Sequence, residues 1–450
     1  MTLSRTRIRF LFSVLLLTGC GGSGSTLTPP APIVGALPVG AVPASVARGK
    51  LSHVVVIVQE NRSFDNVFNG FPGADTVTSG RTSSGATVAL QPRSFLETYD
   101  ISHEEADYLK AYNGGAMDGF DRESTGGIGG ISGPSNAPPN PEYAFLSPPE
   151  TAQYFALAKG YTLADRFFPS QIDSSFAAHQ YLIAAQAGGA VNVPTKPPWG
   201  CDAAPGTVVA TLDPDRSLGP GVFPCFSYAT LADELDAKGR SWRYYAPAIG
   251  GDQGQVWSAY DAVRQIRYGP DWQRSVISPE TRVLTDIAAG SLSDVTWIVP
   301  DFVNSDHPAS NSVSGPDWVT SIVNAVGKSP FWSSTAIVVF WDDWGGLYDH
   351  VAPPQTDADG LGIRTPLLVI SPYAKRGYVS HVQYETGSVD RFIEGVFSLS
   401  TLANSDGRAT DLSDCFDFTQ SPRSFSSFAL RSPASTLMRR RPSDLPPDTD

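Results

Sequence analysis

The stretch His53-Val-Val-Val-Ile-Val-Gln-Glu-Asn-Arg-Ser-Phe-Asp65 decides the fold. It begins with an apolar run, His53–Gln59, that contains no Gly or Pro, and it turns polar abruptly at Glu60. A short apolar run with a polar boundary is typical of a strand that is buried on both faces of a parallel sheet. Ligands of such sheets bind outside the carboxyl ends of the strands. Glu60 and Asn61 are therefore expected where a ligand would be held.

Further apolar runs predict more buried parallel strands, and amphipathic stretches between them predict helices of about three turns. The alternation favours an α/β fold, a three-layer sandwich around a mostly parallel sheet. The other predicted strands are Trp242–Ala246, Val295–Pro300, Thr335–Trp341 and Pro366–Ser371. The predicted helices are Pro149–Gly160, Ser175–Ala187, Thr230–Gly239, Asp317–Gly327 and Ser388–Phe397.

Three tracts rich in Gly, Ser and Pro interrupt this alternation: Phe71–Gly85, Gly114–Pro141 and Gly188–Asp215. They lack a periodic apolar pattern, so we expect long surface loops or lids over the site.

A second strand end carries two more acids. The run Ala336-Ile-Val-Val-Phe-Trp341 is followed by Asp342 and Asp343. If this strand and His53–Gln59 are parallel neighbours, four oxygen ligands converge on one edge, as a divalent cation requires. The alternative is that these acids cap the helices or turns that follow.

A nucleophile for such a site is available in the segment Phe167–Leu182, where a loop enters a predicted helix at Ser174 and Ser175. Free N–H groups at a helix N-terminus favour a phosphate and stabilise a serine alkoxide beside a metal ion. Serine is also a preferred N-cap for reasons unrelated to chemistry, which is the alternative interpretation.

Three of the six histidines are candidate phosphate contacts or general acids. His307 follows a predicted strand, His350 lies shortly after the Asp342-Asp343 pair, and His103 precedes a Gly-rich tract. For the other three histidines a structural role is favoured: His53, His179 and His381.

The N-terminal region resembles an export signal. Three arginines precede the apolar run Phe10–Leu17, which is too short to span a bilayer, and small residues lead to Cys20. This pattern predicts a lipoprotein signal peptide at residues 1–19 and a lipid-anchored, flexible tether at 20–48. The alternative is an ordinary cleaved signal with an incidental cysteine. We expect the folded domain to span 49–432 and a disordered tail to follow at 433–450.

The net charge limits the classes of molecule that the chain is expected to bind, and the cysteine positions indicate one disulfide. The formal net charge of −13 disfavours binding to nucleic acid. With Cys20 assigned to lipid, a disulfide is predicted between Cys201 and Cys225, which lie in a Pro/Gly-rich insertion, while Cys415 is expected to be buried and free.

Four motifs resemble the bacterial phospholipase C and acid phosphatase family, a branch of the alkaline-phosphatase-like superfamily. The resemblance covers residues 50 to about 400. The motifs are His53–Asp65, the serine-bearing segment, Asp306-His-Pro308 and Trp341-Asp-Asp-Trp-Gly-Gly-Leu-Tyr-Asp-His-Val-Ala-Pro-Pro354.

The resemblance implies an alkaline-phosphatase-like fold and hydrolysis of phosphate esters or phospholipids through a phosphoserine intermediate. The predicted export signal places this activity outside the cytoplasm. It also implies that Ser175 is the nucleophile and that His307 and His350 match family histidines. The implied metal ligands are Glu60, Asn61, Asp342, Asp343 and Ser175. The donors suit calcium, magnesium or manganese and do not exclude zinc or iron.

Two departures from the family pattern bear on the site. Asp173-Ser-Ser-Phe-Ala-Ala-His179 stands where many members have Gly-Pro-Thr followed by Pro-Asn-Arg, and Asp343 stands where they often have glutamate. Two other function classes stay open: a surface lipoprotein that keeps the fold as a binding module, and a sulfatase-like esterase. The missing Cys-x-Pro-x-Arg motif argues against the sulfatase-like alternative.

Overall fold

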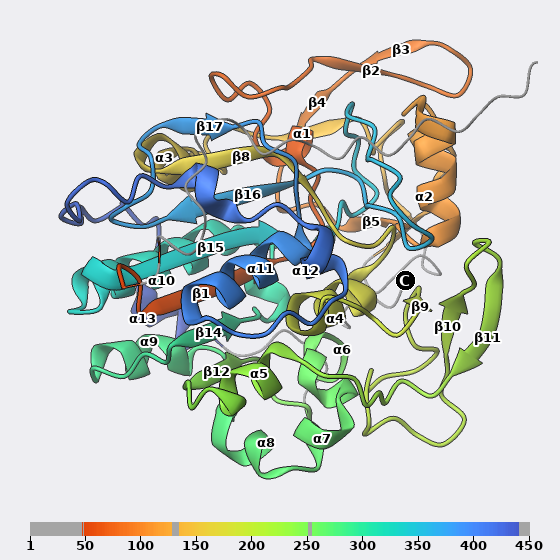
Figure 1. Ribbon diagram of the computed structural model, residues 1–450. Helices are drawn as coiled ribbons and strands as arrows, with labels where there is room; N and C mark the ends of the chain where they lie inside the picture. Colours follow the sequence, from red (N-terminus) through yellow and green to blue (C-terminus); the bar gives the residue numbers. More distant parts are fainter. Residues whose placement is uncertain (1–46, 48, 128–134, 251–253, 441–450) are drawn as a thin grey trace, which may run out of the picture. The chain divides into compact units, whose positions relative to one another are not determined.

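The computed structural model describes residue 47 and residues 49–127, 135–250 and 254–440. The predicted signal peptide, Cys20 and most of the tether lie outside these residues. A central sheet of nine strands organises the rest (Figure 1). Its strand order is β13-β12-β14-β1-β15-β16-β8-β17, with β18 beside β8. The strands are β1 His53–Gln59, β8 Thr162–Phe168, β12 Trp242–Tyr245, β13 Val276–Ile277, β14 Val295–Ile298, β15 Thr335–Trp341, β16 Thr365–Ile370, β17 Tyr378–Ser380 and β18 Tyr384–Glu385.

The five predicted strands are present, and the five strands from β13 to β15 are parallel, as expected. One prediction is wrong: β16 runs antiparallel to both of its neighbours, β15 and β8. A run that is buried on both faces has the same apolar composition in either direction, so composition does not reveal orientation. Strand β8 was not predicted, because Asp165 and Arg166 interrupt its apolar pattern.

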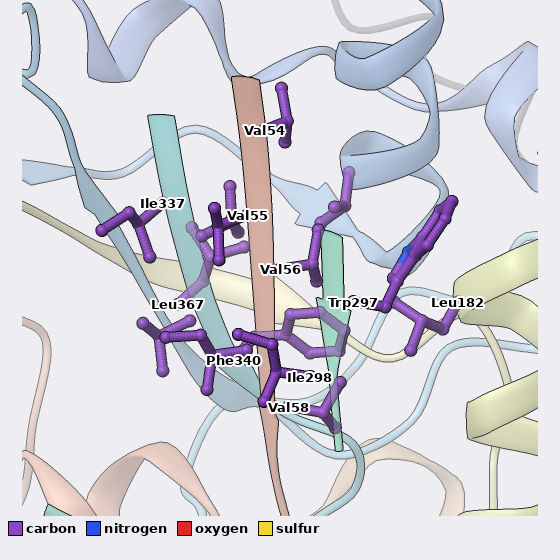
Figure 2. Packing of buried hydrophobic residues seen from close by; sticks show 14 of the residues in the cluster. Val54, Val55, Val56, Val58, Leu182, Trp297, Ile298, Ile337, Phe340 and Leu367 are labelled. Carbon is purple, nitrogen blue, oxygen red and sulfur yellow. The ribbon is translucent and has the colours of Figure 1, made fainter. Parts of the chain in front are cut away.

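The centre of the sheet is buried on both faces. Every residue of β1 after His53 is buried, so both faces are covered. Figure 2 shows Val54 and Val56 on the side where Leu182 of helix α4 lies, and Val55 on the other side. This is the alternation expected of a strand.

Two groups of helices provide the cover. Helices α4 Ser175–Ala184, α5 Leu231–Ala237 and α11 Thr386–Phe397 pack together, and α3 Ala152–Gly160, α9 Arg282–Ala288 and α10 Gly315–Lys328 form the second group. All five predicted helices are confirmed within a few residues. The remaining helices are α1 Phe64–Val67, α2 Glu105–Tyr112, α6 Gly254–Trp257, α7 Arg264–Arg267, α8 Pro270–Ser275, α12 Ser405–Arg408 and α13 Ala434–Leu437. Within the described ranges, no helix combines the length and apolar character needed to cross a membrane.

Each of the three predicted loops contains at least one short strand. The small sheets pair β2 Ser79–Arg81 with β3 Thr87–Ala89, β4 Gln91–Arg93 with β7 Ala144–Leu146, β5 Tyr99–Ile101 with β6 Thr125–Gly127, and β10 Val209–Leu212 with both β9 Ala190–Val191 and β11 Leu218–Val222. Strands of two to five residues are too short to give a periodic signal.

The cysteine predictions are confirmed: Cys201 and Cys225 form a disulfide, and Cys415 is buried and unpaired. The start of the predicted tail differs from expectation. Residues Ala434–Leu437 form the helical turn α13, whose Leu437 is buried against the core.

Candidate active site

Strand register brings the two acidic strand ends together. In the parallel pair of β1 and β15, Gln59 lies opposite Trp341, so Glu60 and Asp342 leave the sheet side by side. The N–H of Asp342 donates to the carbonyl of Gln59 at 3.0 Å, and the N–H of Asn61 donates to Asp342 Oδ1 at 3.0 Å. The convergence that the sequence predicted is therefore produced by neighbouring strands.

Ser175 lies between these two ligand pairs. It is the first residue of α4, and its Oγ is 3.4 Å from Glu60 Oε2, 3.4 Å from Asp343 Oδ2 and 3.4 Å from Asn61 Nδ2. Ser174 is the N-cap residue, but its buried hydroxyl makes no hydrogen bond. The structure thus brings Ser175, and not Ser174, to the acidic residues.

The donor set fits a cation. Hydrogen bonds between a hydroxyl and a carboxylate are normally about 2.5–3.0 Å, so contacts of 3.4 Å are long for hydrogen bonds. Atoms that bind one cation at roughly 2.0–2.3 Å lie about 3.0–3.5 Å apart, as here. Two buried oxygens, Asn61 Oδ1 and Asp342 Oδ2, accept no hydrogen bond. A half turn of the Asn61 amide would put Oδ1 where Nδ2 now faces Asp343 and Ser175.

Electrostatics agree with this fit. Burial, reinforced by the charge of Asp342, raises the pKa of Glu60 to about 7. Burial and the charges of Asp342 and Glu60 also raise the pKa of Asp343. Burial alone would raise the pKa of Asp342 too, but the hydrogen bond and charge of His179 lower it. A divalent ion would likewise offset the repulsion among these buried carboxylates.

His179 is a site residue that sequence reasoning missed. Its Nε2 is 3.1 Å from Glu60 Oε1 and 3.6 Å from Asp342 Oδ2, and these three side chains are spaced to hold a metal ion. Burial alone would lower the pKa of His179, but the two carboxylates raise it to about 10. The sequence did contain a signal for this role. His179 follows Ser175 by four residues on the predicted helix, and residues i and i+4 of a helix lie on the same face.

His103 and His307 also reach the site. His103 Nε2 accepts from Asn61 Nδ2 at 2.8 Å and lies 3.8 Å from Asp343 Oδ2, while its Nδ1 donates to the Ile101 carbonyl at 3.0 Å. The ring of His307 lies 6.2 Å from that of His103, and its Nδ1 donates to the Pro308 carbonyl at 2.5 Å. Both imidazoles thus stand on the Asp343 side of the cluster.

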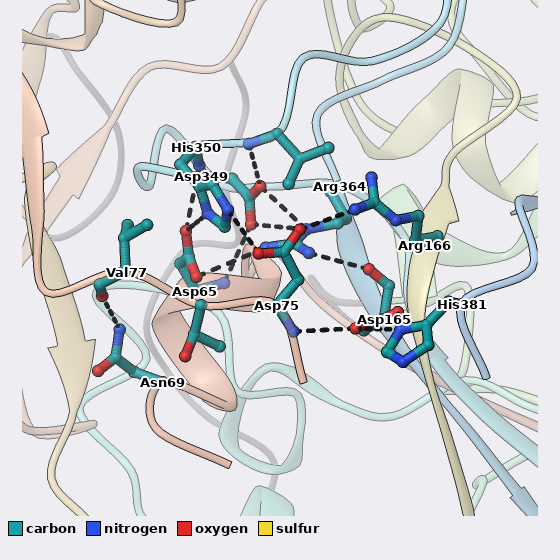
Figure 3. Close-up of polar contacts among 12 residues, drawn as sticks. Asp65, Asn69, Asp75, Val77, Asp165, Arg166, Asp349, His350, Arg364 and His381 are labelled. Carbon is teal, nitrogen blue, oxygen red and sulfur yellow. Dashed lines mark hydrogen bonds and ion pairs between the residues drawn. The ribbon is translucent and has the colours of Figure 1, made fainter. Parts of the chain in front are cut away.

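His350 lies apart from the groups that surround Ser175, in contact with two other carboxylates. Its Nδ1 is 2.6 Å from Asp65 Oδ2 and its Nε2 is 3.1 Å from Asp75 Oδ1 (Figure 3). In the described part of the chain, none of its hydrogen bonds or ion pairs reaches Ser175 or the predicted ligands. We call this second group the Arg364 cluster: Asp65, Asp75, Asp165, Asp349, His350 and Arg364.

Asp65, Asp349 and His350 have ligand-like spacing, but Arg364 already provides a positive charge there. Its Nε donates to both oxygens of Asp349 at 3.0 and 3.1 Å, and its Nη2 lies 3.5 Å from Asp65 Oδ1. A second cation against the same carboxylates would face a buried guanidinium, so we assign no metal to this cluster.

Inserted segments border the site. The N–H of Asn192, just after β9, donates to Asp173, two residues before Ser175, and Asn192 Oδ1 accepts from the N–H of Glu105 in α2. Burial raises the pKa of Asp173 to about 7. The predicted loops therefore contact the segments that carry Ser175 and His103.

Known proteins that are similar in sequence to this chain include several named phospholipase C. The non-hemolytic phospholipase C of Pseudomonas aeruginosa is 27% identical over 464 residues, a match that covers 88% of this chain and 62% of that protein. Phospholipase C A of Mycobacterium tuberculosis is 25% identical and is covered to 85% by a match over 91% of this chain. Non-specific phospholipase C3 of Arabidopsis thaliana is 25% identical, with 78% of this chain and 70% of that protein covered.

A solved structure from the alkaline phosphatase superfamily, from Vibrio parahaemolyticus, aligns with a TM-score of 0.38 and 9% identity over 81% of this chain and 71% of that chain. The model of the phosphoesterase family matches residues 51–400, which include both acidic strand ends and Ser175. The chain belongs to the phosphoesterase family.

Proposed function

We propose that the chain is a metal-dependent hydrolase of phosphate esters that acts outside the cytoplasm, with Ser175 as its nucleophile. The observation that carries the proposal is the convergence of Glu60, Asn61 and Asp343 on Ser175 Oγ. The relatives named phospholipase C favour a phospholipid diester over a phosphomonoester as substrate.

The residues supply the following chemistry. Ser175 Oγ loses its proton and attacks phosphorus, the bond to the leaving alkoxide breaks and that alkoxide takes up a proton, and water then cleaves the bond between Ser175 Oγ and phosphorus. A diester substrate would release a phosphomonoester in this second step, and a monoester substrate would release phosphate. The N-terminus of α4 presents free N–H groups to the phosphoryl oxygens. A bound divalent ion lowers the pKa of the serine hydroxyl and offsets charge on the phosphoryl oxygens. Glu60, Asn61, Asp342 and Asp343 would hold that ion, with Ser175 beside it.

The two histidines have a separate role in this proposal. His103 and His307 line the Asp343 side of the site and would donate protons or hydrogen bonds to substrate oxygens. In both rings Nδ1 donates to a backbone carbonyl, which fixes the orientation of the ring, and each imidazole would donate from Nε2 only when this nitrogen is protonated as well. Export and the lipid on Cys20 remain part of the proposal on the strength of the N-terminal sequence.

Matched serine variants test the proposal. Turnover of a short-chain phosphatidylcholine and of a chromogenic phosphomonoester is measured for the wild type, Ser175→Ala and Ser174→Ala, with and without a chelator. We expect Ser175→Ala to lower kcat by about a thousandfold or more. Ser174→Ala should retain activity, since its hydroxyl makes no hydrogen bond. A wild type that is inert on both substrates with calcium, magnesium, manganese, zinc and iron supplied would end the proposal.

A further inference from the structure

We propose that the Arg364 cluster positions the metal site, with His350 as a positioning residue that acts through Asp65. The cluster holds the segment Glu60–Asp65 against the segment Asp342–His350, and so fixes the spacing between the two ligand pairs. This inference rests on the proposed function, because it concerns the cation that these pairs would hold.

Besides the contact between the His350 ring and Asp65, three hydrogen bonds join the two segments beyond the ligands. The hydroxyl of Ser63 donates to the Tyr348 carbonyl at 2.8 Å, and the N–H of Asp65 donates to Asp349 Oδ2 at 3.0 Å. The N–H of His350 donates to Asp65 Oδ2 at 3.1 Å. All three lie within a few residues of Asn61 or Asp343, so a shift at these bonds is passed along a short length of chain.

Asp65 is the centre of this connection. Its carboxylate is fully buried, with Oδ2 facing the His350 ring at 2.6 Å and Oδ1 facing Arg364 at 3.5 Å. A buried carboxylate that loses a cationic partner must move or take up a proton. Either change weakens the hydrogen bond that Asp65 Oδ2 accepts from the backbone N–H of His350.

The two segments that carry the ligands pack too closely to absorb a displacement of Asp65. Gly345 has a φ of +60°, and a Cβ at this position would lie 2.2 Å from the Asn61 carbonyl oxygen. Arg364 ties the same region to β16, because its carbonyl accepts from the N–H of Phe64 at 2.9 Å and its guanidinium lies 4.4 Å from the centre of the Phe64 ring.

The two nitrogens of His350 have different roles in this proposal. Nδ1 contacts Asp65, inside the connection between the segments, whereas Nε2 contacts Asp75, whose side chain is 40% exposed. We assign the positioning effect to the Nδ1 contact alone. The variant His350→Asn keeps a nitrogen near the place of Nδ1, and His350→Gln keeps one near the place of Nε2.

The test compares these variants by calorimetric titration of the metal-free protein with Mn²⁺ and with Ca²⁺. The control is His381→Gln: His381 pairs with Asp165 in the same cluster, is 60% exposed and contacts neither ligand segment in the described structure. We expect His350→Leu and His350→Gln to bind about 10- to 100-fold more weakly than the wild type. His350→Asn and the control should stay within about threefold of it.

Each outcome has a distinct meaning. Wild-type affinity in His350→Gln, or weak binding by His350→Asn beside strong binding by His350→Gln, would overturn the inference. His350→Asn and His350→Gln both remove the imidazole ring and its charge. The comparison between them therefore tests the inference even if His350→Leu fails to fold. If the wild type binds neither ion, the titrations are repeated with Mg²⁺, Zn²⁺ and Fe²⁺, and a wild type that binds none of the five would contradict the proposed function, and this inference with it.

Discussion

Gly345 shows how closely the two ligand segments approach each other. Its positive φ and the 2.2 Å separation between a built Cβ and the Asn61 carbonyl oxygen leave no room for a side chain. Because Asn61 is a proposed metal ligand, a side chain here should displace it.

We expect Gly345→Ala to lower kcat/KM at least tenfold, on the order of the loss of an outer contact to a metal ligand. The control is Gly290→Ala, which has a φ of +77° but no atom within 4 Å of a Cβ. It should lose about 1–2 kcal/mol of stability from backbone strain and keep its activity. Equal activities in the two variants would show that the approach to Asn61 is unimportant; steady-state kinetics and denaturant unfolding measure both effects.

Much of the candidate site was predicted from residue types at the ends of predicted strands. The register between β1 and β15 explains why those residues lie together. Glu60 and Asp342 could be placed at strand ends from composition, and neighbouring parallel strands then bring them together. His179 was missed because a buried histidine in a helix is more often structural, and its partners come from β1 and β15, far away in the sequence. The contacts of His350 could not be predicted, because six residues of loop separate it from Asp343, and sequence does not say where such a loop turns.

At the scale of elements, orientation was the property that sequence could not supply. The apolar run of β16 predicted a strand correctly, but its direction depends on the connection from β15, which passes through the loop that contains Asp349 and His350. That same reversal places Arg364, at the start of β16, beside Asp349. The antiparallel strand is thus what brings the Arg364 cluster together.

The connection between α1 and this loop should depend on pH. Burial alone would lower the pKa of His350, but the hydrogen bond and charge of Asp65 and the charge of Asp349 raise it, against an opposing effect of Arg364. A histidine whose folded pKa is raised stabilises the fold fully below its unfolded pKa of about 6.5, and this stabilisation is lost as pH rises through the folded value.

We therefore expect the melting temperature of the wild type to exceed that of His350→Gln by more at pH 6 than at pH 9, by about 2 °C or more. Asp75, the carboxylate that faces Nε2, has a pKa lowered chiefly by His350 against the effect of its own burial, so it stays charged across this range. A pH-independent difference in thermal unfolding would contradict the assigned charge of His350.

At the scale of the whole molecule, a disulfide constrains one of the inserted segments. Cys201 and Cys225 lie in the insertion that carries β9–β11, and 24 residues separate them. The insertion reaches the site through Asn192 and Asp173. Its shape should therefore influence both stability and access to Ser175.

We expect the double variant Cys201→Ser, Cys225→Ser to be less stable by about 3 kcal/mol, the value for closing a loop of this length in the unfolded chain. Denaturant unfolding measures the difference. A reductant should destabilise the wild type and leave the double variant unchanged. Equal stabilities without reductant would mean that the disulfide does not constrain the unfolded chain.

The central claim is that one cation lies between the two acidic strand ends beside Ser175, and anomalous diffraction from crystals grown with Mn²⁺ tests it most directly. We predict a peak within about 2.0–2.6 Å of oxygens of Glu60 and Asp343, next to Ser175 Oγ, and no peak among Asp65, Asp349 and His350. A peak in the Arg364 cluster alone, or one out of reach of Ser175, would contradict the account.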